Sequence, residues 1–379
     1  MKKKLVLPVL LTLVLTACDP KSVTFTLEKH TSEQEIHTQI QLERFINNPD
    51  VLGNFYNTVT YVDDLMPNTD YTKPGSVELK WTAAVDRGSI SSYTVKLSEK
   101  SDMSDVLTYS TGSTSLEVTN LKINTQYYWN VSYKSFVSET ASFKTNNTVI
   151  RGIDVDGVKN VRDLGSFYKI KQGLIYRGGE FENYNKSKDT ITTLVTDKGA
   201  KTLKEELKIK TEIDLRKNDS ESKENGLITK SSVSGLNYVS LPMFYGGKNL
   251  LTYSDETFNN PARIKDFFEI LADQNNYPIY FHCSQGKDRT GIMAYLIESL
   301  LGQAKDDIYK DYLYSNLADK SFQMKKSGID NQYGETLEEY GETLDGSPTH
   351  QQIVYSYLSN VIGVSTSNLD KIINYLKVM

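Results

Sequence analysis

The sequence predicts an α/β domain, with a central and mostly parallel sheet flanked by helices, preceded by an all-β sandwich. The middle of the chain carries short runs of alternating apolar and polar residues separated by turn residues, which is typical of a sandwich. From Val149 onward, strand-like and helix-like segments alternate instead, and this alternation predicts a parallel sheet. The polar tripeptide Asn146-Asn147-Thr148 marks the linker between the two parts.

Length and composition are those of an ordinary globular protein of about two to three domains. The chain has 379 residues, of which 24% are charged and 38% are hydrophobic. Its net charge of −5 and its pI of about 5.6 argue against nucleic acid as a partner. No group of His, Cys and carboxylate residues has the spacing of a metal site, so we expect no metal and no cofactor.

The N-terminus has the features of a secretory signal. Three lysines at 2–4 precede an apolar run at 5–15, which is too short to span a membrane. The order Leu15-Thr16-Ala17-Cys18 resembles the bacterial lipobox, which implies cleavage before Cys18 and lipidation of its sulfur. The expected product is an extracytoplasmic protein anchored to the cell membrane by lipid; a plain signal peptide with an incidental cysteine is the alternative. Cys283 is then the one remaining thiol, and we expect no disulfide.

The predicted organisation has four parts: a lipoprotein signal peptide at 1–17, an N-terminal tether at 18–67, the sandwich at 68–146 and the α/β domain at 147–379. Within the tether, 22–27 alternates like a strand, and 30–45 has the spacing of an amphipathic helix.

Aromatic residues recur in the strands of the predicted sandwich. The strands are expected at 76–81, 93–97, 116–118 and 127–133. The spacing of Leu121, Thr125 and Tyr127 resembles the tyrosine corner of fibronectin type III domains, and Trp81 stands where their core tryptophan stands. The proline usual in that turn is absent, and Asn124 lies there. Core packing is the default for such aromatic residues, and a sugar-binding face is the alternative.

In the α/β part, apolar spacing predicts strands at 211–216, 238–242 and 279–281, and helices at 264–271, 292–301, 308–316 and 365–376. The helix at 292–301 should end at Gly302. The polar segment 325–349 contains four glycines and is expected to be a mobile segment that could cover the site.

The stretch 282–291, His-Cys-Ser-Gln-Gly-Lys-Asp-Arg-Thr-Gly, lies between a predicted strand and a predicted helix. Such a turn aims backbone N–H groups at an anion. Cys283 would lie beneath a helix N-terminus beside Lys287 and Arg289, and these positive charges stabilise a thiolate, which is a good nucleophile toward phosphorus. Arg289 has the planar fork that holds two phosphate oxygens.

The other residues of this stretch have supporting tasks. Gly286 lets the backbone turn closely around a ligand, and Thr290 can offer its hydroxyl to the departing sulfur. His282 can orient the loop through its ring N–H. The expected substrate-binding residues are His282, Ser284, Gln285, Gly286 and Lys287.

The stretch resembles the signature loop of cysteine-dependent phosphatases, and its Gly-Lys-Asp-Arg-Thr-Gly ending resembles atypical bacterial tyrosine and phosphoinositide phosphatases. Patches at 160–165 and 173–179 resemble the same family, so the resemblance covers 150–379 in pieces. It implies a protein tyrosine phosphatase-like fold. It also implies hydrolysis of phosphate monoesters through a thiophosphate on the enzyme. The implied partners are phosphotyrosine proteins, with phosphoserine, phosphothreonine and phosphoinositides left open.

The proton donor for the leaving oxygen is the least certain element. Asp214 and Asp288 are the candidates. Asp214 is favoured because it lies at a strand end, where a parallel sheet gathers its active-site loops, whereas Asp288 could brace the loop. The alternatives to an enzyme are a catalytically silent phosphate-binding protein and a carbohydrate-binding surface lipoprotein.

Overall fold

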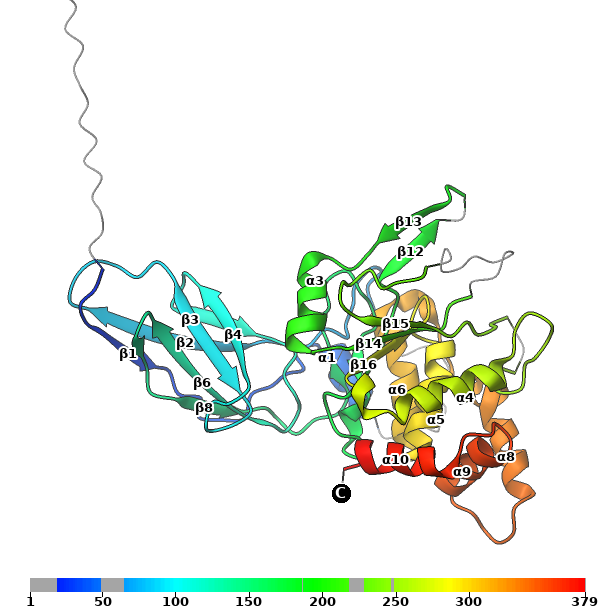
Figure 1. Cartoon of the computed structure of the whole chain (residues 1–379). Coiled ribbons are helices and arrows are strands. Elements are labelled where there is room, and N and C mark those ends of the chain that lie inside the picture. The colour runs from blue at the N-terminus through cyan, green and yellow to red at the C-terminus, as the bar shows by residue number, and fades with distance from the viewer. Residues whose placement is uncertain (1–18, 49–64, 186, 218–227, 247–248, 379) are drawn as a thin grey trace, which may run out of the picture. The chain divides into compact units, whose positions relative to one another are not determined.

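The computed structural model describes residues 19–48, 65–185, 187–217, 228–246 and 249–378. These residues form two compact units (Figure 1). The first unit combines residues 19–32 with Glu78–Glu117 and Gln126–Lys144, and the second holds the other described residues. Cys18 and the predicted signal peptide lie outside the described residues.

The first unit is a sandwich of two antiparallel sheets. One sheet has the order β1 (Val23–Leu27), β2 (Val77–Val85) and β5 (Ser115–Val118). The other has the order β4 (Val106–Thr111), β3 (Tyr93–Ser98), β6 (Gln126–Tyr133) and β7 (Phe136–Val137), with β8 (Ala141–Lys144) paired to β6. The predicted strand at 22–27 is therefore confirmed, and it belongs to this sandwich.

Aromatic rings fill the interior of the sandwich. The ring of Trp81 lies 6.4 Å from that of Trp129 and 5.4 Å from that of Tyr93, and all three side chains are buried. Tyr127 is buried as well and stacks on Phe143. These aromatic residues therefore pack the core, as strand alternation predicts, and form no sugar-binding face.

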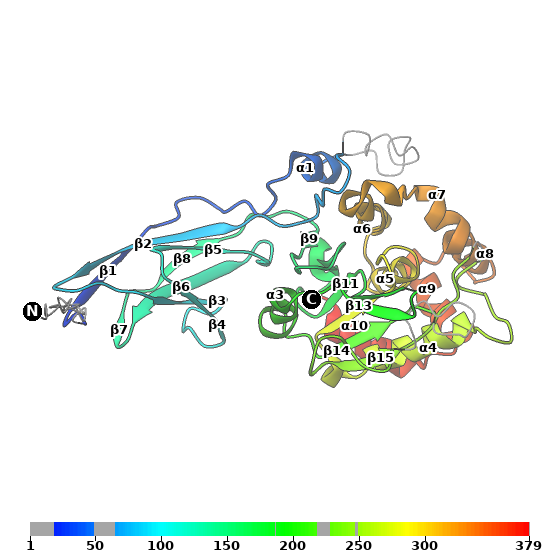
Figure 2. The same ribbon diagram turned by 90° about the horizontal axis from the view of Figure 1, so that it is seen from above.

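The second unit is built on a six-stranded sheet of order β15-β14-β16-β11-β10-β9. Figure 2 labels β9, β11, β14 and β15 of this sheet. The strands are β9 (Arg151–Gly152), β10 (Arg162–Asp163), β11 (Ile175–Gly178), β14 (Thr211–Asp214), β15 (Asn237–Ser240) and β16 (Ile279–His282). The pairs β14–β15, β14–β16 and β11–β16 are parallel, whereas β9, β10 and β11 pair antiparallel. The mostly parallel sheet is confirmed, and its central strand β16 leads into the cysteine-containing loop.

Both faces of this sheet are covered by apolar cores. Side chains alternate along each strand, so a strand contributes to both cores. On β16, Ile279 and Phe281 enter the large helical core, whereas Tyr280 enters a smaller cluster on the opposite face. The large core is lined by α4 (Asn260–Leu271), α5 (Arg289–Leu300), α6 (Lys305–Ala318), α9 (His350–Asn360) and α10 (Thr366–Leu376). The smaller cluster includes residues next to α3 (Asp197–Lys201) and a π-helix at Thr202–Glu206. Gly302 follows α5 with φ of +77°, as predicted for its end.

The structure differs from the sequence-based expectation in two segments. The helix expected at 30–45 is limited to α1 (Ile40–Ile46), because Gln34 pairs with Thr145 and the Ile36 carbonyl accepts the Gly75 N–H. The segment 325–349 is largely helical, with α7 (Lys326–Ile329), a π-helix (Asp330–Gly334) and α8 (Glu335–Glu342). Ile329, Tyr333 and Leu337, four residues apart, are buried in the core.

The remaining elements are short. They are the hairpin β12 (Glu182–Asn185) and β13 (Thr190–Thr193), and single turns of 3₁₀-helix at Leu164–Phe167, Gln274–Asn276 and Lys320–Phe322. Within the described part of the chain, no helix is both long and apolar enough to span a membrane.

Candidate active site

The candidate nucleophile lies at the carboxyl end of the central strand. Cys283 directly follows β16, is 2% exposed and forms no disulfide. The loop then turns back at Gly286, where φ is +69°, and α5 begins at Arg289. A Cβ at Gly286 would lie 2.2 Å from the carbonyl oxygen of Gly178, so no larger residue fits this turn. The loop is therefore packed tightly against the end of β11.

His282 is held rigidly beneath the loop. Its Nε2 lies 3.0 Å from the carboxylate of Glu212 and its Nδ1 lies 3.2 Å from the Cys283 carbonyl. Burial alone would lower the pKa of His282, but the charges of Asp214 and Glu212 outweigh burial and raise the pKa to about 9. The ring is therefore cationic at neutral pH, and both of its nitrogens donate hydrogen bonds.

Asp214 is fully buried at the end of β14, in a cluster of charged side chains. Its carboxylate accepts hydrogen bonds from Arg216, the shortest at 2.7 Å, and from the Tyr238 hydroxyl at 2.8 Å. Burial would raise the pKa of Asp214, but the charges of His282 and Arg216 lower it to about 2. The same Arg216 pairs with Glu182 and Glu180. These contacts are those of a structural ion-pair cluster in which Asp214 stays charged.

Asp288 has a different environment at the start of α5. Its side chain is 16% exposed and lies 4.0 Å from the amine of Lys287. Burial raises the pKa of Asp288 above its ordinary value, although Lys287, Arg289 and a hydrogen bond from Tyr245 oppose the rise. Asp288 is the one carboxyl group in the loop at 282–291, and its raised pKa favours the protonated form.

The side chain of Arg289 is buried at the start of α5. Its guanidinium donates to the Leu215 carbonyl at 3.4 Å and lies 5.7 Å from the ring centre of Tyr245. Tyr245 is 38% exposed, so its ring forms an aromatic edge beside the arginine. No pattern in the sequence points to Tyr245, because it lies in a non-repetitive segment far from the loop in the chain.

Lys287 and Thr290 complete the loop. The Lys287 amine lies 3.5 Å from the Phe322 carbonyl and 5.1 Å from the Phe322 ring centre, so its charge is directed to the flank of the loop. Thr290 is fully buried, and its hydroxyl has no hydrogen-bond partner within the described residues. That hydroxyl is available to a group that enters the loop. Of the remaining predicted residues, Ser284 is half-buried and Gln285 is exposed.

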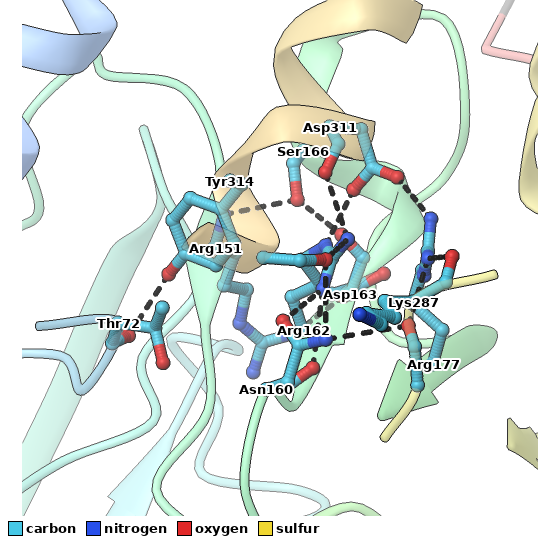
Figure 3. Close-up of polar contacts among 12 residues, drawn as sticks. Thr72, Arg151, Asn160, Arg162, Asp163, Ser166, Arg177, Lys287, Asp311 and Tyr314 are labelled. Atoms are coloured by element: carbon cyan, nitrogen blue, oxygen red, sulfur yellow. Dashed lines mark hydrogen bonds and ion pairs between the residues drawn. The ribbon is translucent and has the colours of Figure 1, made fainter. Parts of the chain in front are cut away.

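A network of buried polar side chains lies behind the loop (Figure 3). Asp311 on α6 pairs with Arg162 at 2.6 Å and with Arg177, and both arginines are fully buried. Asn160 lies between Arg162 and the loop. From the sequence, no task was assigned to any of these four residues. Asn160, Arg162 and Arg177 lie in the patches at 160–165 and 173–179, whereas Asp311 lies outside both.

No set of three or more His, Cys, Asp or Glu side chains within the described ranges is arranged to hold a metal ion.

Comparison with protein families gives two matches. Residues 153–378 match the family model described as "Tyrosine phosphatase family", and residues 72–146 match the model of the fibronectin type III domain. A stretch of 64 residues is 41% identical to a Cupriavidus necator protein named "Putative tyrosine-protein phosphatase". Another of 57 residues is 39% identical to a "Tyrosine-protein phosphatase" of Nostoc commune. These stretches cover 16% and 15% of this chain, and the chain spans only 23% and 19% of the length of these two relatives.

Solved structures give more distant matches. The core catalytic domain of the PP-IP phosphatase SIW14 from S. cerevisiae is 19% identical, with a TM-score of 0.27, over 45% of this chain and 91% of that one. TpbA of P. aeruginosa is 16% identical, with a TM-score of 0.30, over 49% of this chain and 89% of that one. The family match spans more than half of the chain and includes the whole loop and its supporting residues. The chain therefore belongs to the tyrosine phosphatase family.

Proposed function

We propose that the protein is a cysteine-dependent phosphatase that hydrolyses phosphate monoesters. The observation that carries this proposal is the tight loop in which Cys283 ends the central strand and Arg289 opens α5. The thiol and the guanidinium thus belong to one cradle at a helix N-terminus, where an anion is stabilised. Membership of the tyrosine phosphatase family supports the same chemistry.

The reaction proceeds in two steps. The Cys283 thiolate attacks phosphorus, an S–P bond forms, and the ester P–O bond breaks while the leaving oxygen takes a proton from Asp288. Water then attacks the phosphorus, gives a proton to the Asp288 carboxylate and releases phosphate, and the sulfur departs as a thiolate. Arg289 and the loop amides hold the equatorial oxygens in both steps. The Thr290 hydroxyl donates a hydrogen bond to the departing sulfur.

The assignment of the acid to Asp288 replaces the preference for Asp214 that the sequence suggested. Asp214 is fully buried, its carboxylate is taken up by Arg216 and Tyr238, and its pKa of about 2 leaves no proton to donate at neutral pH. Asp288 lies in the loop, is partly exposed and has a raised pKa. A carboxyl group with a raised pKa is the better general acid.

Phosphotyrosine is the substrate class that the surroundings of the loop favour. The half-exposed ring of Tyr245 lies beside Arg289 and can pack on an aromatic leaving group. Lys287 adds a positive charge at the flank of the loop, which suits substrates with a further phosphate, such as phosphoinositides. Phosphoserine and phosphothreonine peptides belong in the same comparison.

The test is a hydrolysis panel with an aryl phosphate, a phosphotyrosine peptide, a phosphoserine peptide and a soluble phosphoinositide. We expect turnover of the aryl phosphate and the phosphotyrosine peptide, and we expect Cys283→Ser to lose several decades of rate because an alcohol is not ionised in this site. Wild-type protein that binds phosphate and hydrolyses none of the substrates would instead be the silent phosphate-binding protein. Cys283→Ser with activity within about tenfold of wild type would contradict the covalent mechanism.

We further propose that the protein is anchored to the cell membrane on its extracytoplasmic side through lipid on Cys18. The support is the order of basic, apolar and small residues that ends at Cys18. Cys18→Ala should move the protein from the membrane fraction to the soluble fraction. A variant that stays with the membrane would place the anchor elsewhere.

A further inference from the structure

Four successive carbonyl groups of the loop accept hydrogen bonds from outside it. The Ser284 carbonyl accepts the N–H of Glu180 at 3.2 Å. The Gln285 carbonyl accepts the Asn160 side-chain amide at 3.0 Å. The remaining two accept Arg177 Nη2, at 2.9 Å for Gly286 and 3.4 Å for Lys287. Every carbonyl between Ser284 and Lys287 is therefore held on the outer side of the loop.

Because a peptide group is planar, the direction of each of these carbonyls also sets the direction of the next N–H group. The C=O of a trans peptide points away from the N–H of the next residue, because both lie in one plane on opposite sides. Fixing the carbonyls of 284–287 therefore turns the N–H groups of 285–288 to the inner side of the loop. Within the described residues, these four N–H groups have no backbone carbonyl as acceptor. These four N–H groups can therefore donate to an anion inside the loop.

The side chains that donate to these loop carbonyls are themselves oriented by further hydrogen bonds and ion pairs. Arg162 donates to Asn160 Oδ1 at 2.7 Å, and because a guanidinium only donates, the Asn160 oxygen must face Arg162 and its NH₂ must face the loop. Asp311 receives Arg162 and Arg177 on its two carboxylate oxygens. Asn160, Arg162 and Arg177 are fully buried and Asp311 is nearly so, as Figure 3 shows for their mutual contacts. A continuous network of polar contacts thus connects α6 to the loop through the two arginines.

We propose that Asn160 and Arg177 are positioning residues that keep the loop amides converged on the phosphate site before a ligand arrives. This inference rests on the proposed phosphatase function, because it assigns the cradle its anion. Neither residue contacts the phosphate; each acts through a carbonyl of the loop. Without these donors, the peptides after Gln285 and Gly286 are free to rotate, and part of the binding energy of the phosphate is then spent on ordering them.

Two variants and a matched control test the inference. Arg177→Lys keeps the charge opposite Asp311 but loses the fork that reaches the Gly286 carbonyl. Asn160→Leu removes the amide donor at similar size. Arg151→Lys makes the same chemical change at a buried arginine on β9 that pairs with Asp163 on β10 at 2.7 Å. The readouts are the dissociation constant for tungstate, kcat and KM for an aryl phosphate, and the thermal unfolding midpoint.

We expect Arg177→Lys and Asn160→Leu to weaken tungstate binding by about tenfold or more, since each misdirects amides that bind a charged ligand. Arg151→Lys should lower the unfolding midpoint while its tungstate affinity stays that of wild type. Folded Arg177→Lys or Asn160→Leu protein with wild-type tungstate affinity would overturn the inference and leave the phosphatase function intact. Wild-type protein that neither binds tungstate nor turns over would overturn the proposed function itself.

A structure of the unliganded wild-type protein gives an independent test if the variants do not fold. The N–H groups of 285–288 should converge on one point in the absence of any oxyanion. A flipped peptide among them would refute the role of Asn160 and Arg177.

Discussion

Replacement of Asp214 by Asn tests whether this residue is structural or catalytic. The change removes one negative charge from a cluster in which Arg216, fully buried, pairs with Asp214, Glu182 and Glu180. The depression of the Asp214 pKa from 3.8 to about 2 corresponds to roughly 2–3 kcal/mol of stability. Breaking a buried ion pair costs about 3–5 kcal/mol. Because two carboxylates still pair with Arg216, we expect a loss near the lower figure.

A loss of about 3 kcal/mol should lower the unfolding midpoint by roughly 6–12 °C in a domain of this size. A lowered pKa means that the carboxylate stabilises the fold above pH 3.8 and that this contribution is lost as the pH falls toward about 2. The difference between wild type and variant should therefore be largest between about pH 4 and 6.5 and shrink below about pH 4. It should also shrink as the pH rises from 6.5 toward about 9, because the Asp214 charge helps to raise the His282 pKa to about 9. Thermal unfolding over a pH series measures it, with aryl phosphate turnover of the folded protein as the second readout. A variant with wild-type stability that fails only on poor leaving groups would refute the structural role and restore Asp214 as the acid.

Three further variants probe the loop. Asp288→Asn should lose about 10²–10⁴-fold in rate on alkyl phosphates and little on aryl phosphates with good leaving groups, as measured by rate against leaving-group pKa; an equal loss on both would mean that Asp288 only braces the loop. Because the acid must be protonated, kcat for an alkyl phosphate should fall as pH rises through the raised pKa of Asp288, and Tyr245→Phe should move this fall to higher pH, since the Tyr245 hydroxyl lowers that pKa. A pH profile unchanged in Tyr245→Phe would exclude the contact from the chemistry. Arg289→Lys should cost about 10²–10³-fold in kcat/KM because a point charge cannot replace a bidentate fork, and a variant with the wild-type rate would show that Arg289 does not hold the phosphate.

Local signals were sufficient to predict much of the fold and the centre of the site. The strand before Cys283 and the helix after it follow from largely apolar runs, and Gly302 ends that helix because glycine tolerates a positive φ. The loop itself was predictable because its chemistry requires particular residue types within ten consecutive positions. The sandwich core was predictable from strand alternation, since Trp81 and Trp129 alternate with polar neighbours.

The failures have a common physical cause, which is contact between segments distant in the chain. The sequence shows Asp214 at a strand end but not the hydrogen bond from Tyr238, nor the charge of His282 that helps to lower its pKa. In the segment 325–349, the abundance of glutamate and glycine hid the three buried residues that make it helical.

Some functional contacts could not be predicted from the sequence for the same reason. Asn160 is adjacent to a recognisable patch, but its two bonds to the loop span more than a hundred residues. Tyr245 reaches Arg289 from a segment without periodicity. Such roles depend on which surfaces meet, and a single sequence does not encode them in any local pattern.

The central claim is that Cys283 carries the phosphoryl group during turnover. It is tested most directly by rapid acid quenching of the wild-type protein with an aryl phosphate, followed by mass spectrometry of the peptide that contains Cys283. The account predicts that this peptide gains the mass of one phosphoryl group in the wild-type protein and not in Cys283→Ser. An active enzyme whose phosphoryl group appears on another residue, or on none, would contradict it.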